Sequence, residues 1–194
     1  AKLVAETYGR EPSKTLDYRE MTKNAAIEAV FVFTDWSTHI GIAMDAMERG
    51  KAVAMEVGCA YSVRECWDLV RTYERTKSPF MMLENCCFDK DELMVTNMVR
   101  RGKLGTVVYC SGAYGHDLRE EIADGYKNRH YRKDNYLHRN CENYPTHELG
   151  PIAKILDINR GNRMLSLVSF ASKGVGMREY IKEKRPEEYS DGLV

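Results

Sequence analysis

The sequence predicts a protein of the α/β class with a parallel β-sheet. Between residues 29 and 104, three short apolar segments of strand length alternate with three segments whose apolar residues recur every three or four positions. The first pattern is typical of buried strands and the second of amphipathic helices. Strand–helix units in series fold into a parallel sheet with right-handed crossovers, so we expect this architecture in the first half of the chain.

The first unit spans residues 29–50. Residues 29–34 form a continuous apolar run, which predicts a strand that is buried on both faces. Ser37 or Thr38 is expected to cap the following helix, and Gly50 to end it. The predicted buried face of this helix consists of Ile40, Ala43, Met44 and Met47.

The second and third units repeat the pattern. Residues 51–57 predict a strand, and Ser62 with Glu65 forms a capping box at the start of the next helix. Its predicted buried face consists of Val63, Cys66, Trp67, Val70 and Tyr73. Residues 79–84 predict the third strand and residues 89–101 the third helix. The inward residues of that helix are expected to be Met94, Val95, Met98 and Val99.

The pattern changes after Gly105, where we place a domain boundary. Residues 106–114 predict a longer strand that no helix follows. Residues 117–143 are polar and aromatic without a clear period, which indicates a long functional or disordered loop. A helix over residues 146–159 and a strand over residues 165–172 complete the predicted elements.

Composition argues against several function classes. The 194 residues include 29 Lys+Arg and 29 Asp+Glu, so no net positive charge favours nucleic acid or an anionic membrane surface. No apolar run approaches the roughly 20 residues that span a bilayer. We therefore expect neither nucleic acid nor a membrane as a partner. The first residues show no signal peptide, and the expected compartment stays open between cytoplasmic and exported.

The cysteines do not predict a metal site. None belongs to a C-x-x-C pair, and the adjacent Cys86 and Cys87 point to opposite sides of an extended segment. We expect reduced thiols within strands and helices, and no bound metal. The six cysteines are Cys59, Cys66, Cys86, Cys87, Cys110 and Cys141.

Polar residues follow each predicted strand, and parallel strands place them along one edge of the sheet, where such folds bind ligands. These segments are residues 35–39, 56–58 and 84–87. Ser37 and Thr38 also suit plain helix capping, and His39 suits a satisfied histidine of the first turn. Glu56 has no such simple explanation, because a carboxylate that ends an apolar strand is costly unless it is paired or functional.

A second group of candidate residues follows Gly105. It combines phenols, imidazoles and a guanidinium, the groups that transfer protons and bind hydroxyls. Its members are Tyr114, His116, Arg132, Tyr144, Pro145, Thr146 and His147. A polar surface loop with aromatic anchors is the alternative interpretation.

The chain lacks the G-x-G-x-x-G turn with which a dinucleotide-binding domain holds the pyrophosphate. Either the chain contains no such domain, or the first strands of the domain are absent from it.

Several strings of residues resemble the Gfo/Idh/MocA oxidoreductase family, and within it the glycoside hydrolase family 109 branch. They are residues 34–39 with Glu56, residues 83–89, 112–119, 143–147, 149–151 and 157–161. The resemblance covers most of residues 25–172 and implies part of a Rossmann-type parallel sheet followed by part of an α/β substrate domain with an open sheet. Residues 1–104 would then be the C-terminal portion of the dinucleotide-binding domain, and residues 105–194 the start of the substrate domain.

The resemblance also implies the cofactor, the partner and the site. The implied cofactor is NAD, and the implied partner is a small-molecule sugar or glycoside. A homo-oligomer is also compatible with the family. The implied NAD contacts are Trp36, Ser37, Thr38, His39, Glu56, Val57, Asn85 and Tyr144. The implied sugar contacts are Tyr114, Arg132, Tyr144, Pro145, Thr146 and His147. Tyr114, Tyr144 and His147 are the candidates for the catalytic proton transfers, with His116 as a further one.

The sequence departs from what the resemblance implies for the ordinary dehydrogenases of the larger family. They have Glu-Lys-Pro where this chain has Glu56-Val57-Gly58, and an Asp and a His where it has His147 and Pro151. The resemblance therefore favours a glycosidase that oxidises the sugar at C3, removes the C2 proton, eliminates the glycosidic oxygen, adds water and reduces C3 again. A net NAD(P)-dependent sugar dehydrogenase and an inactive sugar- or partner-binding fragment are the alternatives.

Overall fold

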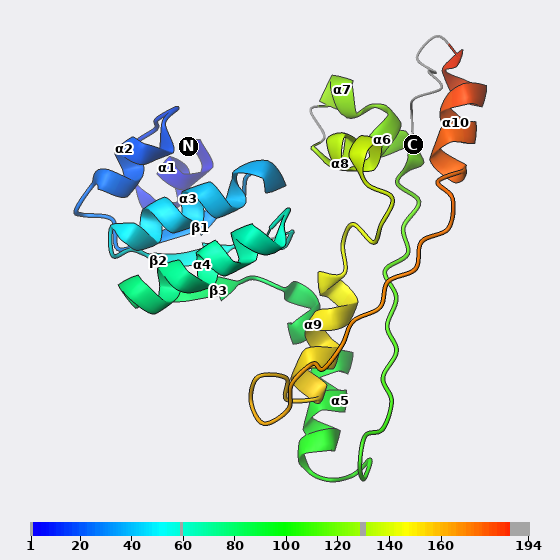
Figure 1. The fold of residues 1–194 in the computed structure, drawn as a ribbon. Helices are drawn as coiled ribbons and strands as arrows, with labels where there is room; N and C mark the ends of the chain where they lie inside the picture. The colour runs from blue at the N-terminus through cyan, green and yellow to red at the C-terminus, as the bar shows by residue number, and fades with distance from the viewer. Residues whose placement is uncertain (1, 59, 129–130, 187–194) are drawn as a thin grey trace. The chain divides into compact units, whose positions relative to one another are not determined.

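The computed structural model describes residues 2–58, 60–128 and 131–186, and the chain divides into two compact units, Ala1–Leu83 and Glu84–Val194 (Figure 1). The division lies after Leu83, earlier than the boundary expected near Gly105. The reason is that helices η1 (Asn85–Phe88) and α5 (Lys90–Arg100) contact α9 (Thr146–Ile155) in the second unit.

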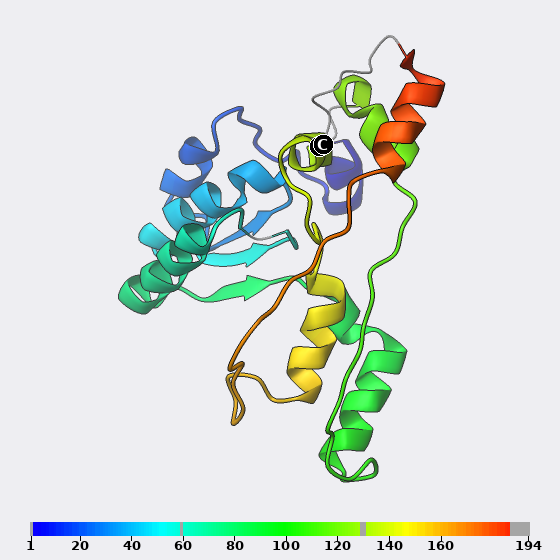
Figure 2. The same ribbon diagram turned by 45° about the vertical axis from the view of Figure 1, so that its right-hand side comes forward.

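The first unit contains a three-stranded parallel sheet, which confirms the predicted fold class. Strands β1 (Ala29–Val32), β2 (Ala52–Met55) and β3 (Phe80–Met82) lie in the order β1-β2-β3. Figure 2 shows the three strands running in the same direction. Val30 pairs with Val53, and Val53 pairs with Phe80.

One face of the sheet carries the core, so burial of β1 on both faces was a wrong expectation. Val30 and Val32 are buried, whereas Phe31 is 65% exposed. The covering element is α3 (Trp36–Glu48), which contacts β1 and β2. Of its predicted face, Ile40, Ala43 and Met47 are buried and Met44 is half-buried. Two further helices, α1 (Lys2–Tyr8) and α2 (Tyr18–Lys23), precede the sheet.

The N-terminal caps of α3 and α4 (Val63–Thr76) are set by local hydrogen bonds. Asp35 caps α3 by accepting from the Ser37 N–H at 3.0 Å, so Ser37 and Thr38 lie within the first turn and neither is the cap. The prediction of a capping box at the start of α4 is confirmed in part. The Ser62 hydroxyl accepts from the Glu65 N–H, and the Glu65 carboxylate accepts from the Tyr61 N–H in place of the Ser62 N–H.

The predicted buried face of α4 is wrong among the described residues. Leu69 and Thr72 are the buried positions of this helix, because it packs against α3 through them. The apolar residues of the predicted face lie on the exposed side; they are Val63, Cys66, Trp67, Val70 and Tyr73. Helical periodicity identifies an apolar stripe but not the element that covers it.

The second unit is helical where it is regular. The segment 117–143, expected to be a loop, folds into α6 (Arg119–Ala123), α7 (Gly125–Asn128) and α8 (Arg132–His138). These short helices contact one another, and α6 also contacts α10 (Gly176–Lys184). The prediction failed because helices of four to seven residues are too short to show a period.

The strands predicted over residues 106–114 and 165–172 are absent from the described chain. Figure 1 draws both segments as extended coil, and Val108 and Phe170 are more than 90% exposed. A strand needs a neighbour for its backbone hydrogen bonds, and the described residues offer none to these segments.

Two helices of the second unit differ in detail from their prediction. Helix α9 ends at Ile155 instead of residue 159, because Asp157 and Asn159 take positive φ angles in the turn that follows. In α5 the expected inward residue Met94 is 54% exposed, whereas Thr96 is buried. None of the described helices has the length and apolarity that crossing a bilayer requires.

Candidate active site

In the first unit, the turn after β1 holds most of its own polar groups. The Thr38 hydroxyl donates to the Asp35 carbonyl at 2.9 Å and lies 2.7 Å from the Thr34 hydroxyl, while the Ser37 hydroxyl donates to the Asp35 carboxylate. These contacts shape the turn. A ligand at this edge of the sheet would meet Ser37 and Thr38 in positions that the turn has already set.

His39 lies beneath this turn and is fully buried. Its Nε2 is 2.9 Å from the Thr34 carbonyl oxygen, the geometry of a donor to that oxygen. Its Nδ1 has no partner among the described residues. His39 therefore contacts the backbone of the turn through Nε2 alone, so it matches the expected satisfied histidine of the first turn only in part.

Trp36 joins the turn after β1 to the turn after β2. Its side chain is buried and covers Gly58, which has a φ of +83°. A Cβ atom at Gly58 would lie 2.0 Å from the Trp36 Nε1, so no residue other than glycine fits there without a shift. The close approach of indole and backbone fixes the relative positions of the two turns within the first unit.

Glu56 and Val57 follow β2 at the same edge. The Glu56 carboxylate is half-buried, accepts from the Val57 N–H at 3.0 Å and forms no ion pair with a described residue. It can therefore still accept from hydroxyl groups such as those of a ribose. Val57 is 1% exposed, so it can offer a ligand its backbone only.

These groups fit part of a dinucleotide. The Glu56 carboxylate suits ribose hydroxyls at the carboxyl end of β2, whereas the Trp36 indole occupies the space beside Gly58. A glycine-rich turn for the pyrophosphate is not among the described residues. The remaining implied NAD contacts, Asn85 and Tyr144, belong to the second unit, where Asn85 is exposed at the start of η1.

In the second unit, the predicted aromatic residues come together at the start of α9. The Tyr144 and His147 rings are 4.4 Å apart between centroids, with an angle of 83° between their planes. The Tyr114 ring lies 5.0 Å from Tyr144 and 5.4 Å from His147. His116 is 4.6 Å from Tyr114 and is exposed. Residues 30 positions apart in the chain thus form one cluster, which we call the Tyr–His cluster: Tyr114, Tyr144 and His147.

Arg132 packs on this cluster from α8. Its guanidinium carbon lies 4.9 Å from the centre of the Tyr144 ring, a cation–π distance. Burial lowers the pKa of Arg132, whereas the neighbouring Tyr131 and Tyr114 oxygens raise it. Together the two tyrosines outweigh burial, so the pKa is above the ordinary guanidinium value. The group stays positively charged beside the phenols.

Glu84 lies in the segment 84–87 that the sequence placed at the ligand-binding edge, but it was not among the implied contact residues. Its side chain is buried, and its Oε1 lies 2.7 Å from the His147 Nδ1 and accepts from the Cys86 N–H at 3.0 Å. The available signal was a carboxylate directly after an apolar strand, the same signal that selected Glu56. What the sequence could not show is that the partner lies 63 residues further along the chain.

Gly150 allows Glu84 and His147 to meet. A Cβ atom at Gly150 would lie 2.8 Å from the Glu84 Cγ and 3.0 Å from the Cys87 Sγ. Helix α9 can therefore approach η1 only with glycine at this position. This contact gives a physical role to the string 149–151, which carried part of the family resemblance.

Three buried oxygens at η1 and the start of α9 lack partners among the residues that the structure describes: the Glu84 Oε2, the Thr146 Oγ1 and the Glu148 Oε2. Buried polar atoms are normally hydrogen-bonded, so these atoms are suited to receive groups of a ligand. Pro145, the last of the implied sugar contacts, is exposed at the start of α9.

The thiols near the cluster are poor nucleophiles. Burial, followed by the charge of Glu84, raises the pKa of Cys86 to about 11. Burial also raises the pKa of Cys87. Both thiols are protonated at neutral pH, which argues against a cysteine mechanism. The described cysteines Cys66, Cys86, Cys87, Cys110 and Cys141 are all free, as expected, and Cys59 lies outside the described residues.

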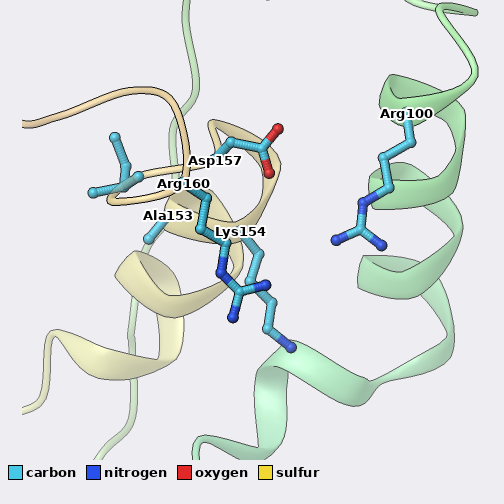
Figure 3. A pocket seen from close by; sticks show the side chains of 6 residues that line it. Arg100, Ala153, Lys154, Asp157 and Arg160 are labelled. Carbon is cyan, nitrogen blue, oxygen red and sulfur yellow. The ribbon is translucent and has the colours of Figure 1, made fainter.

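A basic pocket lies further along α9 and does not include the predicted site residues. Figure 3 shows Lys154 and Arg160 on the side of α9 and its following turn, with Arg100 on α5. Asp157 lies among these cations, and the Lys154 Nζ is 3.9 Å from the centre of the Phe88 ring. This pocket is lined mainly by cationic side chains, whereas the Tyr–His cluster consists of two phenols and an imidazole.

Comparison with known proteins agrees with both units. Residues 1–83 match the model of the oxidoreductase family with an NAD-binding Rossmann fold, and residues 88–192 match the C-terminal domain of glycosyl hydrolase 109. An oxidoreductase from Bacillus cereus is similar in structure, with a TM-score of 0.50 and 25% identity, over 64% of this chain and 38% of that chain.

Curated relatives extend over both units. An alpha-N-acetylgalactosaminidase from Bacteroides fragilis is 44% identical over 171 residues, which cover 86% of this chain and 40% of that protein. A glycosyl hydrolase family 109 protein from Solibacter usitatus is 41% identical over 169 residues, 87% of this chain and 39% of that protein. The chain thus spans about 40% of the length of the curated relatives it matches. The resemblance seen in the sequence is confirmed, and the chain belongs to the glycosyl hydrolase 109 family, with an NAD-binding Rossmann-type first unit.

Proposed function

We propose that this chain is part of an NAD-dependent glycosidase that cleaves α-N-acetylgalactosaminides. The observation that carries the proposal is the Tyr–His cluster with the buried carboxylate of Glu84 on His147. Phenol, imidazole and carboxylate within contact distance are a proton-transfer set. The Bacteroides fragilis relative bears the name of the proposed activity.

The cofactor, when bound, supplies hydride transfer from and back to the sugar C3, so no net oxidation results. The C2 proton becomes acidic once C3 is a ketone, and a base of the protein has to remove it. His147 is suited to this step. Its Nδ1 faces the Glu84 carboxylate, which leaves Nε2 as the nitrogen that can take the proton. Glu84 then stabilises the imidazolium that forms.

The two tyrosines are assigned to the oxygen atoms of the sugar. Tyr114 and Tyr144 place phenol groups around His147, and a phenol can donate a proton to the leaving glycosidic oxygen or accept one from the C3 hydroxyl. The Arg132 guanidinium carbon lies 4.9 Å from the centre of the Tyr144 ring, and the Tyr114 oxygen also neighbours this cation. Both phenols are therefore candidates for the C3 hydroxyl and for the leaving group.

Sugar binding is assigned to the start of α9 and to α8. The buried Thr146 hydroxyl, which has no partner in the described part of the chain, can bind a sugar hydroxyl or the acetamido group. Arg132 and Pro145 are the other residues that we assign to sugar binding. Glu84 is engaged by His147, so it is not free to act as one of the two carboxylates that direct glycoside hydrolysis needs.

The test uses the purified enzyme that contains this chain, without added cofactor. One half of the sample is denatured and its released nucleotide is identified by mass spectrometry; the other half is given p-nitrophenyl α-N-acetylgalactosaminide. Bound NAD together with hydrolysis supports the proposal. Absence of hydrolysis with the cofactor bound would overturn the glycosidase assignment.

A net sugar dehydrogenase is the second candidate, because the similar solved structure from Bacillus cereus is described as an oxidoreductase. The two functions differ in what accumulates. A dehydrogenase builds up reduced nicotinamide when supplied with NAD and free sugar, whereas the glycosidase returns the hydride each cycle. The absorbance of reduced nicotinamide during turnover separates them.

A further inference from the structure

Next to the Glu84–His147 pair lies a third side chain that can ligate a metal, the thiol of Cys86. One ligand atom from each of Glu84, Cys86 and His147 lies within 4.8 Å of the other two. Glu84 and Cys86 stand at the start of η1, and His147 in the first turn of α9. The close packing at Gly150 holds these two helices together, so the group belongs to a rigid contact.

The burial of Glu84 gives independent support for a ligand at this place. The carboxylate is 96% buried, and its Oε2 has no hydrogen-bond partner in the described chain. An unsatisfied buried carboxylate oxygen is costly, and a divalent cation is one of the few groups that offset the cost. The sulfur, nitrogen and oxygen donors together match the ligands of Zn²⁺ better than those of Mg²⁺ or Ca²⁺.

The geometry lies within reach of a tetrahedral site. Bond lengths of 2.0–2.3 Å to Zn²⁺ require its ligand atoms to be about 3.3–3.8 Å apart. The Glu84 Oε1 and His147 Nδ1 are 2.7 Å apart and would have to separate slightly, while the Cys86 sulfur lies within 4.8 Å of a ligand atom of each. Shifts of about 1 Å in side chains are sufficient, and a water molecule would fill the fourth position.

We propose that Glu84, Cys86 and His147 form a binding site for Zn²⁺ or a similar thiophilic divalent cation, and that occupancy of this site inhibits the enzyme. Binding forms a metal–sulfur bond and releases the thiol proton of Cys86 to solvent. It also occupies the imidazole of His147, which can then no longer take the proton from the sugar C2. The inhibition rests on the proposed function, whereas the binding of the metal does not.

The binding test uses Co²⁺ as an optical probe in the full-length, tag-free enzyme. A thiolate bound to Co²⁺ produces a charge-transfer band in the near ultraviolet, and Zn²⁺ should displace it. Cys86→Ser is the test variant, and Cys87→Ser is the matched control, because the two cysteines are adjacent and Cys87 is the more buried of the two. Circular dichroism shows whether both variants are folded.

We expect the band with the wild-type enzyme and with Cys87→Ser, and its loss in Cys86→Ser. Calorimetric affinity for Zn²⁺ should fall at least about tenfold in Cys86→Ser, since even second-shell changes cost about 10–100-fold. A wild-type enzyme without the band, or a band that survives in Cys86→Ser, would overturn the site.

The activity test separates this site from the proposed function. Zn²⁺ should inhibit hydrolysis by the wild type and by Cys87→Ser, while Cys86→Ser should keep its activity and tolerate about tenfold more Zn²⁺, in line with its weaker binding. If the cobalt band forms but Zn²⁺ does not inhibit, the inhibitory part is wrong although the metal site stands. An enzyme with the cobalt band and no glycosidase activity even without metal contradicts the proposed function, not the site.

Discussion

The hydrogen bond between Glu84 and His147 decides which imidazole nitrogen is available to a substrate. It joins residues 63 positions apart at a distance of 2.7 Å, and the Glu84 side chain is almost fully buried. The hydrogen bond to Glu84 fixes the tautomer and the orientation of the imidazole ring. The pair is therefore the first place to test at the scale of single residues.

We expect Glu84→Gln to lower kcat by about 10²–10⁴-fold with a small change in KM, the range by which positioned proton transfer contributes. The amide keeps the shape of the carboxylate but not the charge that stabilises the imidazolium. Steady-state hydrolysis of the nitrophenyl substrate measures the effect. Glu120→Gln, an exposed residue of α6, is the control and should leave kcat unchanged. A wild-type kcat in Glu84→Gln would remove Glu84 from the mechanism.

Gly58 is the residue whose replacement should harm the first unit most directly. Gly58→Ala combines a positive φ with a contact of 2.0 Å to the Trp36 indole, and we expect it to lower the free energy of unfolding by more than about 2 kcal/mol. Gly50→Ala isolates the first effect, because Gly50 has a φ of +70° and open space around it. Its expected cost is about 1–2 kcal/mol. Equal losses in the two variants, measured by urea unfolding, would show that the indole contact is unimportant.

At the scale of elements, the contact between η1 and α9 positions the candidate catalytic groups. Neither helix is long, and η1 is a single turn of four residues. The pair is held by close packing at Gly150 and by the Glu84–His147 hydrogen bond. Activity should therefore respond to small changes in the separation of these helices.

Gly150→Ala tests that dependence. The added methyl group would lie 2.8 Å from the Glu84 Cγ, so α9 has to move away, and we expect a loss of stability of about 1–3 kcal/mol together with a fall in kcat. Gly41→Ala in α3 is the matched control, because nothing lies within 4 Å of its added Cβ. There alanine should stabilise the helix by about 0.5–1 kcal/mol. Thermal melts and steady-state kinetics follow both variants, and a fully active Gly150→Ala would contradict the tight-packing argument.

The ion pair of Asp124 with Arg185 ties the end of α6 to the end of α10. A hydrogen bond from Arg185, opposed by burial and assisted by Lys127, lowers the pKa of Asp124 to about 2. A depressed carboxyl pKa contributes stability above the unfolded value near 4, and the contribution is lost as the pH falls toward 2. Asp124→Asn should therefore lower Tm at pH 7, and the difference from wild type should shrink between pH 4 and pH 2. Asp134→Asn, at an exposed carboxylate of α8, should show no comparable change. A pH-independent difference for Asp124→Asn would argue against the ion pair.

At the scale of the whole molecule, the proposed mechanism and a direct hydrolase differ in the fate of the C2 proton. A base removes this proton in the proposed route and it later returns from solvent, whereas direct displacement at C1 leaves it in place. We expect hydrolysis in D₂O to give a released sugar with deuterium at C2, which NMR of the product detects. Free sugar incubated under the same conditions without enzyme is the control. A product that keeps its C2 proton would exclude the elimination route.

Much of the first unit could be predicted from its sequence, because the signals there are local. An apolar run followed by a helical period identifies each strand–helix unit, and the three parallel strands agree with it. The predictions failed where a partner had to be known. The apolar side of α4 is exposed, and residues 106–114 and 165–172 remain unpaired in the described chain, because burial and strand pairing depend on neighbours that periodicity does not identify.

The sequence by itself determined the parallel α/β class and the family resemblance, and it grouped Tyr114, Tyr144 and His147 as candidate site residues. These follow from periodicity and from unusual strings of residues, which are properties of the chain alone. Only the tertiary structure decided that Glu84 lies on His147, that Cys86 stands beside them and that His39 supports a turn. Such contacts arise when helices distant in sequence pack at van der Waals distance. The need for glycine at position 150 becomes apparent only when its neighbours across the contact, Glu84 and Cys87, are known.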